Sequence, residues 1–341
     1  MKHIFLALGQ NHINNFESLL KNKLIEGDDF ILICGAGSAF NDELWSRTIV
    51  SKVSFNNNAV SKRGQFWTLY YKVGEYARIV KELKPYRNEQ CVIYLAYIED
   101  VLSNYLFFNF NKQANIVIVE DGTLNYYNHT MENVDGLKFK LKKMIALKHG
   151  LKFKKYEGHS SGANYEKVTA QYLTFPEEAF VTKNAKQLPI TKETVENPVP
   201  ELYIIGQEAF GTLLGNEFFL KELANYFSTI KNQSFYNSIS KIYYKPHRNG
   251  MRLSQEYIAD FFPEKEVVFL KTTKTSEEIY FQDLRCSYIS SFDSSTLINI
   301  YSRFSDTSRK EINFYVYPLY SNELMPMFKK LNFNFLHKLQ A

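Results

Sequence analysis

Short apolar runs that end in turn residues recur along the chain, separated by longer stretches in which apolar residues return with helical spacing. A run of about four to eight apolar, β-branched residues without polar alternation is typical of a strand buried on both faces of a parallel sheet. In the first half of the chain, strands are predicted at His3–Leu8, Asp29–Cys34, Gln90–Ala96 and Ile116–Val119. Helices are predicted near Phe16–Leu20, Phe66–Leu83 and Asp100–Phe110. This alternation predicts a doubly wound, mostly parallel α/β sheet.

The pattern breaks at residues 183–200 and then resumes. Three prolines and few large apolar residues in this segment indicate an exposed linker. Beyond it, strands are predicted at Glu201–Ile205, Lys241–Lys245, Val267–Leu270 and Cys286–Ser290, and helices at Phe218–Ile230, at Leu297–Tyr301 and toward the C-terminus. A chain of 341 residues is long enough for two cores. We therefore expect one domain over 1–182, a linker over 183–200, a second domain over 201–320 and a C-terminal helix over 321–341.

Composition restricts the class of protein. No stretch offers the ~18 apolar residues that a membrane-spanning helix needs. The apolar part of the first residues is too short for a signal peptide, so a cytoplasmic protein is expected. Cys34, Cys91 and Cys286 lie in or beside strand-like runs far apart in the sequence, which predicts buried free thiols rather than a zinc site.

Lysines are concentrated in one segment, although the net charge of +5 is mild. Eight lysines and no acid lie between Lys138 and Lys155, interleaved with apolar residues at roughly helical spacing. The segment could be the solvated face of an ordinary helix. It could equally lie on an anionic membrane surface, such as the cytoplasmic face of the inner membrane. Nucleic-acid binding is disfavoured, because no recognisable nucleic-acid module surrounds the segment.

Candidate chemistry begins where the strand Ile116–Val119 ends in Glu120, Asp121 and Gly122. Ligands of open α/β sheets gather at the carboxyl ends of strands, so these acids lie where chemistry is usual. A solvated turn is the ordinary alternative for such a motif. The earlier Gly35-Ala36-Gly37 is interpreted as a turn, because Phe40 occupies the third glycine position of a dinucleotide-binding fingerprint.

Two further motifs follow strands in the second half. Residues 241–250, KIYYKPHRNG, bring His247 to a strand end between Lys245 and Arg248. A histidine there could hydrogen-bond or protonate a departing phosphate while the two basic residues offset its charge. Residues 289–301 place Ser294 and Ser295 at a predicted helix start, where hydroxyls and free backbone N–H groups can bind an anion or simply cap the helix.

The order of these motifs, acid pair and glycine, then Lys-Pro-His, then Ser-Ser, resembles the bacterial sialyltransferases of GT-B type. The resemblance is closest to the lipooligosaccharide sialyltransferases of glycosyltransferase family 52. It spans most of the chain and includes YLTFPE (172–177), YIIGQ (203–207) and TSEEIY (275–280). It implies two Rossmann-like doubly wound domains that face a central cleft. Here Pro246 precedes the histidine, whereas the family has proline after it, where this chain has Arg248.

The resemblance also implies residue roles. Asp121 corresponds to the general base on the acceptor hydroxyl, and His247 to the histidine that binds or protonates the leaving CMP phosphate. Further positions implied on the donor side are Ser294 and Ser295 as the phosphate-holding pair, Lys245, Arg248, Gly206, Gln207, and Glu277 or Glu278 near the ribose. Those implied on the acceptor side are Gly9, Gln10, Glu120 and Gly122.

The function implied is inverting transfer of sialic acid from CMP-sialic acid to a galactose-type acceptor on lipooligosaccharide or capsular polysaccharide. A metal is not required if basic and hydroxyl groups neutralise the leaving phosphate, and the chain has no Asp-x-Asp, so no cofactor is expected. Alternatives are a same-fold glycosyltransferase with another nucleotide sugar, such as a glucosyltransferase, a non-catalytic carbohydrate-binding relative, and a basic nucleic-acid-associated protein. The linkage (2,3 or 2,6), the acceptor and the oligomeric state stay open, and a homodimer is compatible with the family.

Overall fold

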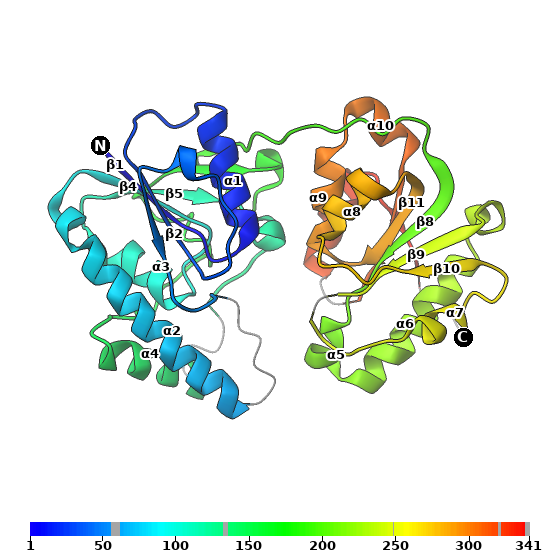
Figure 1. Cartoon of the computed structure of the whole chain (residues 1–341), viewed down its shortest axis with the longest axis horizontal. Helices are drawn as coiled ribbons and strands as arrows, with labels where there is room; N and C mark the ends of the chain where they lie inside the picture. The colour runs from blue at the N-terminus through cyan, green and yellow to red at the C-terminus, as the bar shows by residue number, and fades with distance from the viewer. Residues whose placement is uncertain (56–61, 132–135, 248, 320–321, 338–341) are drawn as a thin grey trace. The chain divides into compact units, whose positions relative to one another are not determined.

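The computed structural model describes residues 1–55, 62–131, 136–247, 249–319 and 322–337. The chain divides into two compact units, Met1–Pro189 and Ile190–Ala341, called the N-terminal and C-terminal units below (Figure 1). The division falls within the segment 183–200 that the sequence predicts to be a linker. Among the described residues, no helix combines the length and the apolar character needed to cross a membrane.

A seven-stranded sheet forms the centre of the N-terminal unit, with the order β3-β2-β1-β4-β5-β6-β7 and every pair parallel. One apolar core packs under α1, and a second packs on the other face under α2, α3 and α4. The strands are β1 (Lys2–Leu6), β2 (Phe30–Cys34), β3 (Arg47–Val50), β4 (Cys91–Leu95), β5 (Asn115–Val119), β6 (Val168–Leu173) and β7 (Ala185–Gln187). The helices are α1 (Gln10–Lys21), η1 (Asp42–Leu44), α2 (Lys62–Leu83), η2 (Lys84–Asn88), α3 (Val101–Tyr105), η3 (Leu106–Phe110), η4 (Gly122–Tyr126), α4 (Leu137–Lys148) and η5 (Pro176–Glu178).

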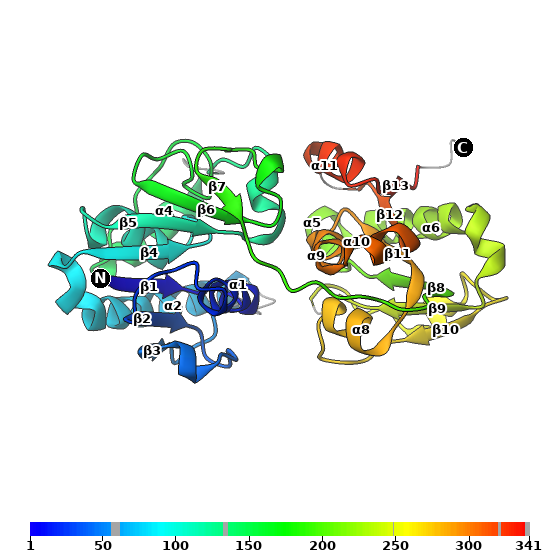
Figure 2. The same ribbon diagram turned by 90° about the horizontal axis from the view of Figure 1, so that it is seen from above.

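The C-terminal unit repeats the plan with six parallel strands in the order β10-β9-β8-β11-β12-β13 (Figure 2). A core rich in tyrosine and phenylalanine lies between the sheet and α6 and α7. The strands are β8 (Val199–Ile205), β9 (Lys241–Lys245), β10 (Glu266–Phe269), β11 (Cys286–Phe292), β12 (Asn313–Tyr317) and β13 (Asn334–Phe335). The helices are α5 (Ala209–Leu214), α6 (Asn216–Lys231), η6 (Ser234–Ser238), α7 (Gln255–Ala259), α8 (Ser276–Asp283), α9 (Ser295–Arg303), α10 (Asp306–Glu311), η7 (Asn322–Leu324) and α11 (Met325–Lys330).

Two parts of the chain differ from the sequence expectation. Segment 183–200 contains β7 and the start of β8, and its middle is bonded to the C-terminal unit through Glu193, whose carbonyl accepts from Ser305 N–H at 2.9 Å. The described part of 321–341 contains the short helix α11 and then β13, not one helix. Phe333 and Leu336 are buried beside this strand, so apolar residues of this segment pack at the edge of the sheet.

Two smaller expectations are confirmed. Gly35-Ala36-Gly37 is a turn: no helix follows it directly, and β3 comes next after η1. The three cysteines are buried free thiols.

Candidate functional site

The strand order of the N-terminal unit reverses between β1 and β4. From β1 the chain proceeds to β2 and β3 on one side, and from β4 onward it proceeds to the other side. At such a reversal, the loops beyond the carboxyl ends of the strands diverge and leave room for a ligand. The loop after β1 leads into α1, and the loop after β5 carries Glu120 and Asp121.

Asp121 is held by a histidine from the first turn of α1. Nδ1 of His12 accepts a hydrogen bond from the Leu8 N–H at 3.1 Å, so the ring proton lies on Nε2. Nε2 donates this proton to Oδ1 of Asp121 at 2.9 Å. His12 is buried, whereas the Asp121 side chain is 37% exposed, so the carboxylate is the member of the pair that reaches solvent. The His12 and Tyr97 rings lie nearly perpendicular to each other, with their centroids 6.4 Å apart.

An amide group completes the surroundings of Asp121. Asn125, in η4, accepts the Asp121 N–H on Oδ1 at 3.2 Å. Its Nδ2 is buried and has no hydrogen-bond partner within the described part of the chain. A buried donor without a partner is costly, and such groups are frequently completed by a ligand or water. Asn125 Nδ2 is therefore a candidate donor to a bound hydroxyl.

Glu120 has the opposite environment, with its carboxylate enclosed by protein groups. It accepts hydrogen bonds from the Tyr126 hydroxyl, from the Thr174 N–H and from Thr174 Oγ1. Burial raises the pKa of Glu120 to about 7, against the effect of these donors. Glu120 thus ties β5 to the segment after β6, and Asp121 alone of the pair is presented to solvent.

The other residues predicted on the acceptor side have backbone or positioning roles. Gly122 has a φ of 53°, the left-handed conformation that favours glycine, and it opens η4. Gly9 is the extended N-cap of α1, and a side chain there would meet open space. Gln10 bonds both the N–H and the carbonyl of Ala39, which fixes the loop after β2.

The C-terminal unit has a corresponding reversal between β8 and β11. Gly206 and Gln207 follow β8, and Ser294 follows β11 as the N-cap of α9. Gln207 Nε2 donates to Ser294 Oγ at 2.8 Å, which joins the two loops across the reversal. Ser294 Oγ also accepts the N–H of Thr296 at 3.2 Å. The first turn of α9, including the half-buried Ser295, thus presents N–H groups at the carboxyl edge of the sheet, where an anion binds favourably.

His247 is anchored by a buried glutamate. The carboxylate of Glu208 accepts the His247 N–H at 2.6 Å and the Tyr244 hydroxyl at 2.8 Å, and burial raises the pKa of this glutamate. The ring nitrogen Nδ1 of His247 contacts the backbone of Asn249, at 3.1 Å from its nitrogen and 2.9 Å from its carbonyl oxygen. Nε2 has no hydrogen bond to a described residue, and the ring is half-buried, so this nitrogen can meet a ligand.

The other residues predicted on the donor side that the structure describes form hydrogen bonds within the protein. Lys245 Nζ donates to the Thr272 carbonyl at 2.8 Å, and burial lowers the pKa of this lysine. Glu278 forms a capping box with Thr275 at the start of α8. Glu277 instead accepts from Asn299 Nδ2 at 3.0 Å, which links α8 to α9. Arg248 lies outside the described residues.

Sequence reasoning missed four side chains that the structure adds: His12, Tyr97, Asn125 and Glu208. His12 could be suspected from its place in the first turn of a helix that follows a strand. The partners of the others lie on separate segments, so their roles required the fold. The structure also explains why residue 206 is a glycine: a Cβ at this position would lie 2.6 Å from the Glu208 carboxylate.

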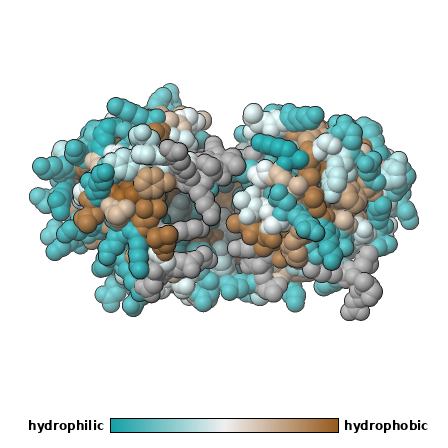
Figure 3. Space-filling view, turned by 90° about the horizontal axis from the view of Figure 1, so that it is seen from below, coloured by the Kyte–Doolittle hydropathy of each residue, from teal (hydrophilic) through white to brown (hydrophobic). Residues whose placement is uncertain are grey.

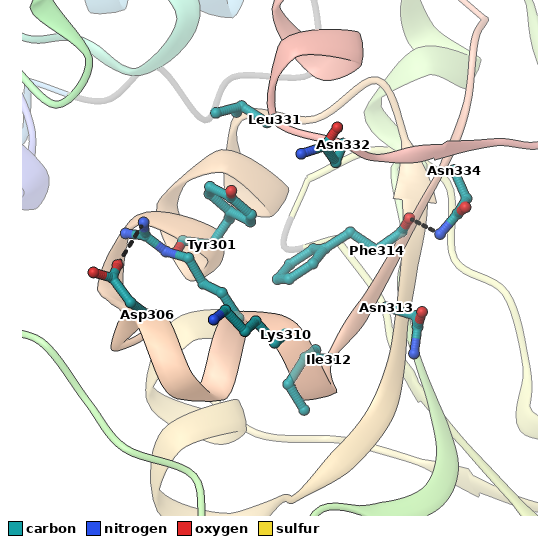
Figure 4. Close-up of a pocket in the computed structure, with 10 residues that line it drawn as sticks. Tyr301, Asp306, Lys310, Ile312, Asn313, Phe314, Leu331, Asn332 and Asn334 are labelled. Carbon is teal, nitrogen blue, oxygen red and sulfur yellow. Dashed lines mark hydrogen bonds and ion pairs between the residues drawn. The ribbon is translucent and has the colours of Figure 1, made fainter.

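A pocket of ≈ 600 Å³ in the C-terminal unit is a different feature (Figure 4). Asn313 and Phe314, at the amino end of β12, line it together with Arg309 of α10. None of the candidate site residues lines it. Because ligands of parallel sheets bind at the carboxyl edge, the pocket does not supply the candidate site.

Comparison with known proteins bears on the fold. No family model and no curated protein matches the sequence. A solved UDP-N-acetylglucosamine 2-epimerase aligns with a TM-score of 0.50 at 8% identity, over 97% of this chain and 81% of its own. The fold is of the GT-B type.

Two further epimerase structures align at similar levels. A putative UDP-N-acetylglucosamine 2-epimerase from Listeria monocytogenes gives a TM-score of 0.49 at 6% identity, covering 97% of this chain and 82% of its own. The Methanocaldococcus jannaschii UDP-GlcNAc 2-epimerase, solved with UDP-GlcNAc and UDP, gives 0.48 at 13% identity, covering 99% and 89%. At these identities the similarity concerns the fold alone.

Proposed function

We propose that this chain is a nucleotide-sugar-dependent glycosyltransferase of the GT-B fold, with CMP-sialic acid as the first donor to test. The observation that carries the proposal is the His12–Asp121 pair, a solvent-facing carboxylate fixed by a buried imidazole at a strand-order reversal. A carboxylate in this position suits removal of a proton from an acceptor hydroxyl. The GT-B fold and the strand-end motifs of the C-terminal unit support a nucleotide donor.

The proposed reaction is a single displacement. Asp121 accepts the proton of the acceptor hydroxyl while the oxygen of that hydroxyl forms a bond to the anomeric carbon of the donor sugar. The bond between that carbon and the donor phosphate breaks, and its electron pair leaves with the phosphate. The N–H groups of the first turn of α9, with Ser294, Ser295 and Nε2 of His247, are the groups proposed to stabilise this leaving phosphate. The product has inverted configuration at the anomeric carbon.

His12 has a positioning role in this scheme. Its Nε2–H fixes one oxygen of Asp121, and its own tautomer is fixed by Leu8. A fixed carboxylate keeps its second oxygen oriented toward the incoming hydroxyl, which reduces the ordering required in the transition state.

The decisive experiment is a donor screen with mass detection of the product. Purified protein is incubated with CMP-sialic acid, UDP-glucose and UDP-N-acetylglucosamine, each with a galactose-terminated acceptor. Transfer from CMP-sialic acid is the expected result. Transfer from a UDP-sugar instead would support a glycosyltransferase that uses a different donor. Conversion of UDP-N-acetylglucosamine to its 2-epimer, which has the same mass and is therefore followed by proton NMR, would indicate epimerisation instead of transfer. Absence of both turnover and nucleotide binding would refute the proposal.

Matched variants then test the two roles. We expect Asp121→Asn to lower kcat by about 10²- to 10⁴-fold while nucleotide affinity stays within a few-fold of wild type. His12→Phe should lower kcat less, by roughly 10- to 100-fold, because the carboxylate loses the hydrogen-bond donor that orients it. Calorimetry of CMP and UDP binding provides the control. Normal turnover in Asp121→Asn would remove Asp121 from the base role.

A further inference from the structure

Large apolar side chains are exposed together on two helices of the N-terminal unit. Helix α2 exposes Trp67 and Tyr71, at 44% and 62%, and helix α4 exposes Leu137, Met144 and Leu147, at 83%, 60% and 67%. These five residues define the α2–α4 surface. Figure 3, which views the side on which α2 and α4 lie in Figure 1, shows hydrophobic residues gathered on the N-terminal unit with hydrophilic residues beside them. Contiguous exposed patches of this kind mark interaction sites in otherwise polar surfaces.

The two helices form one surface because their side chains interlock. The Tyr70 ring of α2 contacts the rings of both Trp67 and Tyr71. The centroid of the same ring lies 4.7 Å from the centroid of the His149 ring and 5.1 Å from the Lys148 ammonium at the end of α4. Gly74 permits this approach, since a Cβ there would lie 3.3 Å from the His149 ring.

Helix α4 is apolar on two opposite faces. Ile145 and Ala146 are buried in the core under the sheet. Leu137, Met144 and Leu147, spaced seven and three residues apart, lie on the outer face. The structure places a second apolar stripe in solvent, where burial against the core cannot account for it.

Exposed lysines share the outer face of α4. Lys140, Lys143 and Lys148 are exposed and alternate with the apolar residues, whereas Lys142 turns inward to donate to the Glu99 carbonyl. No acid occurs in residues 137–155 or in residues 62–74. The α2–α4 surface is therefore apolar and cationic, which complements a surface that is both hydrocarbon-rich and anionic.

We infer that the α2–α4 surface binds an anionic phospholipid bilayer. Trp67 and Tyr71 have amphipathic rings that favour the headgroup level, and the three leucine and methionine side chains enter the outer acyl region. The three exposed lysines pair with lipid phosphates. The site is separate from the His12–Asp121 pair, and vesicle binding can be measured whether or not the proposed glycosyl transfer is correct.

The test is cosedimentation of the full chain with phosphatidylcholine vesicles, with and without phosphatidylglycerol, at low and high salt. Three multiple variants are compared with wild type: Met144→Ser/Leu147→Ser, Lys140→Gln/Lys143→Gln/Lys148→Gln, and the control Leu24→Ser/Leu213→Ser. The control residues are exposed apolar side chains outside the α2–α4 surface, at 45% and 63%. All substituted side chains are exposed, so folding is expected to survive, and circular dichroism checks this.

Wild type is expected to pellet with anionic vesicles at low salt and to be released at high salt. The apolar variant should lose at least about ten-fold in partition coefficient, and the lysine variant on the order of 100-fold, about five-fold per lysine. The control should bind like wild type. Failure of wild type to bind anionic vesicles, or equal losses in the control and apolar variants, would overturn the inference. If light scattering shows that the apolar variant turns a dimer into a monomer while vesicle binding is unchanged, the surface is an interface between copies of the chain instead.

Discussion

At the scale of single residues, Glu120 and Asp121 show how adjacent carboxylates can be separated by their surroundings. Asp121 receives one hydrogen bond from a histidine and faces solvent, whereas Glu120 is buried and receives three hydrogen bonds. Desolvation disfavours the charged form of Glu120, so its pKa is raised to about 7. In sequence the two acids are equivalent members of one motif. Only the fold shows that Glu120 is buried and that Asp121 is exposed to solvent, where a substrate could reach it.

This difference predicts a pH dependence of stability. The pKa of Glu120 in the folded state, about 7, exceeds the ordinary value of 4.5. The folded state therefore holds this proton more tightly than the unfolded state does. The resulting stabilisation is fully present below about pH 4.5 and is lost as the pH rises through 7. Compared with Glu120→Gln, which stays neutral, wild type should lose about 3 kcal/mol of unfolding free energy between about pH 4.5 and pH 8.

Urea denaturation of both proteins across this range measures the difference. Glu177→Gln is the matched control, because Glu177 is an exposed glutamate in the segment after β6. Its unfolding free energy should depend on pH as that of wild type does. A constant difference between wild type and Glu120→Gln at all pH values would show that Glu120 keeps the same protonation in both states.

At the scale of elements, periodicity predicted the central strands of both sheets and missed strands at or toward the edges. Strands β1, β4 and β5 are continuous apolar runs that are buried on both faces, so composition alone marks them. Strand β6 contains the buried Gln171, whose amide donates to the carbonyls of Val181 and Lys183. A satisfied polar residue of this kind interrupts the apolar pattern without harming the strand. It can be recognised only when its partners are known.

The candidate site divides in the same way. Asp121, His247, Gln207 and Ser294 could be named as candidates from sequence, because each follows the carboxyl end of a strand in its own parallel sheet. His12 could not be assigned, since its partner Asp121 lies 109 residues away in sequence. The hydrogen-bond partner of Lys245 could not be predicted either: this lysine stands in the motif, and its ammonium donates to the Thr272 carbonyl.

One glycine controls the loop between β9 and α7. Gly250 has a φ of 103°, and a Cβ there would lie 2.3 Å from the backbone of Glu208. Gly250→Ala must therefore displace the loop from the residues after β8, including the Glu208 carboxylate that holds His247. We expect a loss of about 1–3 kcal/mol in stability and at least about ten-fold weaker nucleotide binding.

Thermal unfolding and calorimetric titration with CMP or UDP measure these effects. Gly9→Ala is the matched control for both, because Gly9 is extended and a Cβ there would meet open space. Unchanged nucleotide affinity in Gly250→Ala would show that the loop between β9 and α7, which carries His247, does not contribute to donor binding.

At the scale of the molecule, each unit has its own apolar core on its own parallel sheet. The cores of the N-terminal unit are built around β1 to β6, and the core beneath α6 and α7 of the C-terminal unit is built from Leu202 and residues that follow it. Domains that hold separate cores can fold independently. The C-terminal unit also includes residues 190–198, which precede its first strand and are bonded to α9, α10 and the turn between them.

These bonds predict where an autonomous fragment must begin. Glu193 donates its N–H to the Arg303 carbonyl at 2.6 Å and pairs its carboxylate with the Arg303 guanidinium at 2.9 Å. Val195 N–H donates to Ser308 Oγ at 2.9 Å, and Lys192 Nζ donates to the Ser302 carbonyl at 2.6 Å.

A fragment of residues 190–341 keeps these contacts, whereas a fragment of residues 198–341 exposes their partners on α9 and α10. With each bond worth about 0.5–1.5 kcal/mol and part of the sum offset by chain entropy, the shorter fragment should be less stable by roughly 2 kcal/mol. Urea titration followed by far-ultraviolet circular dichroism compares the two, and both fragments should unfold cooperatively. Equal stabilities would mean that residues 190–197 act only as a connector, as their sequence suggests.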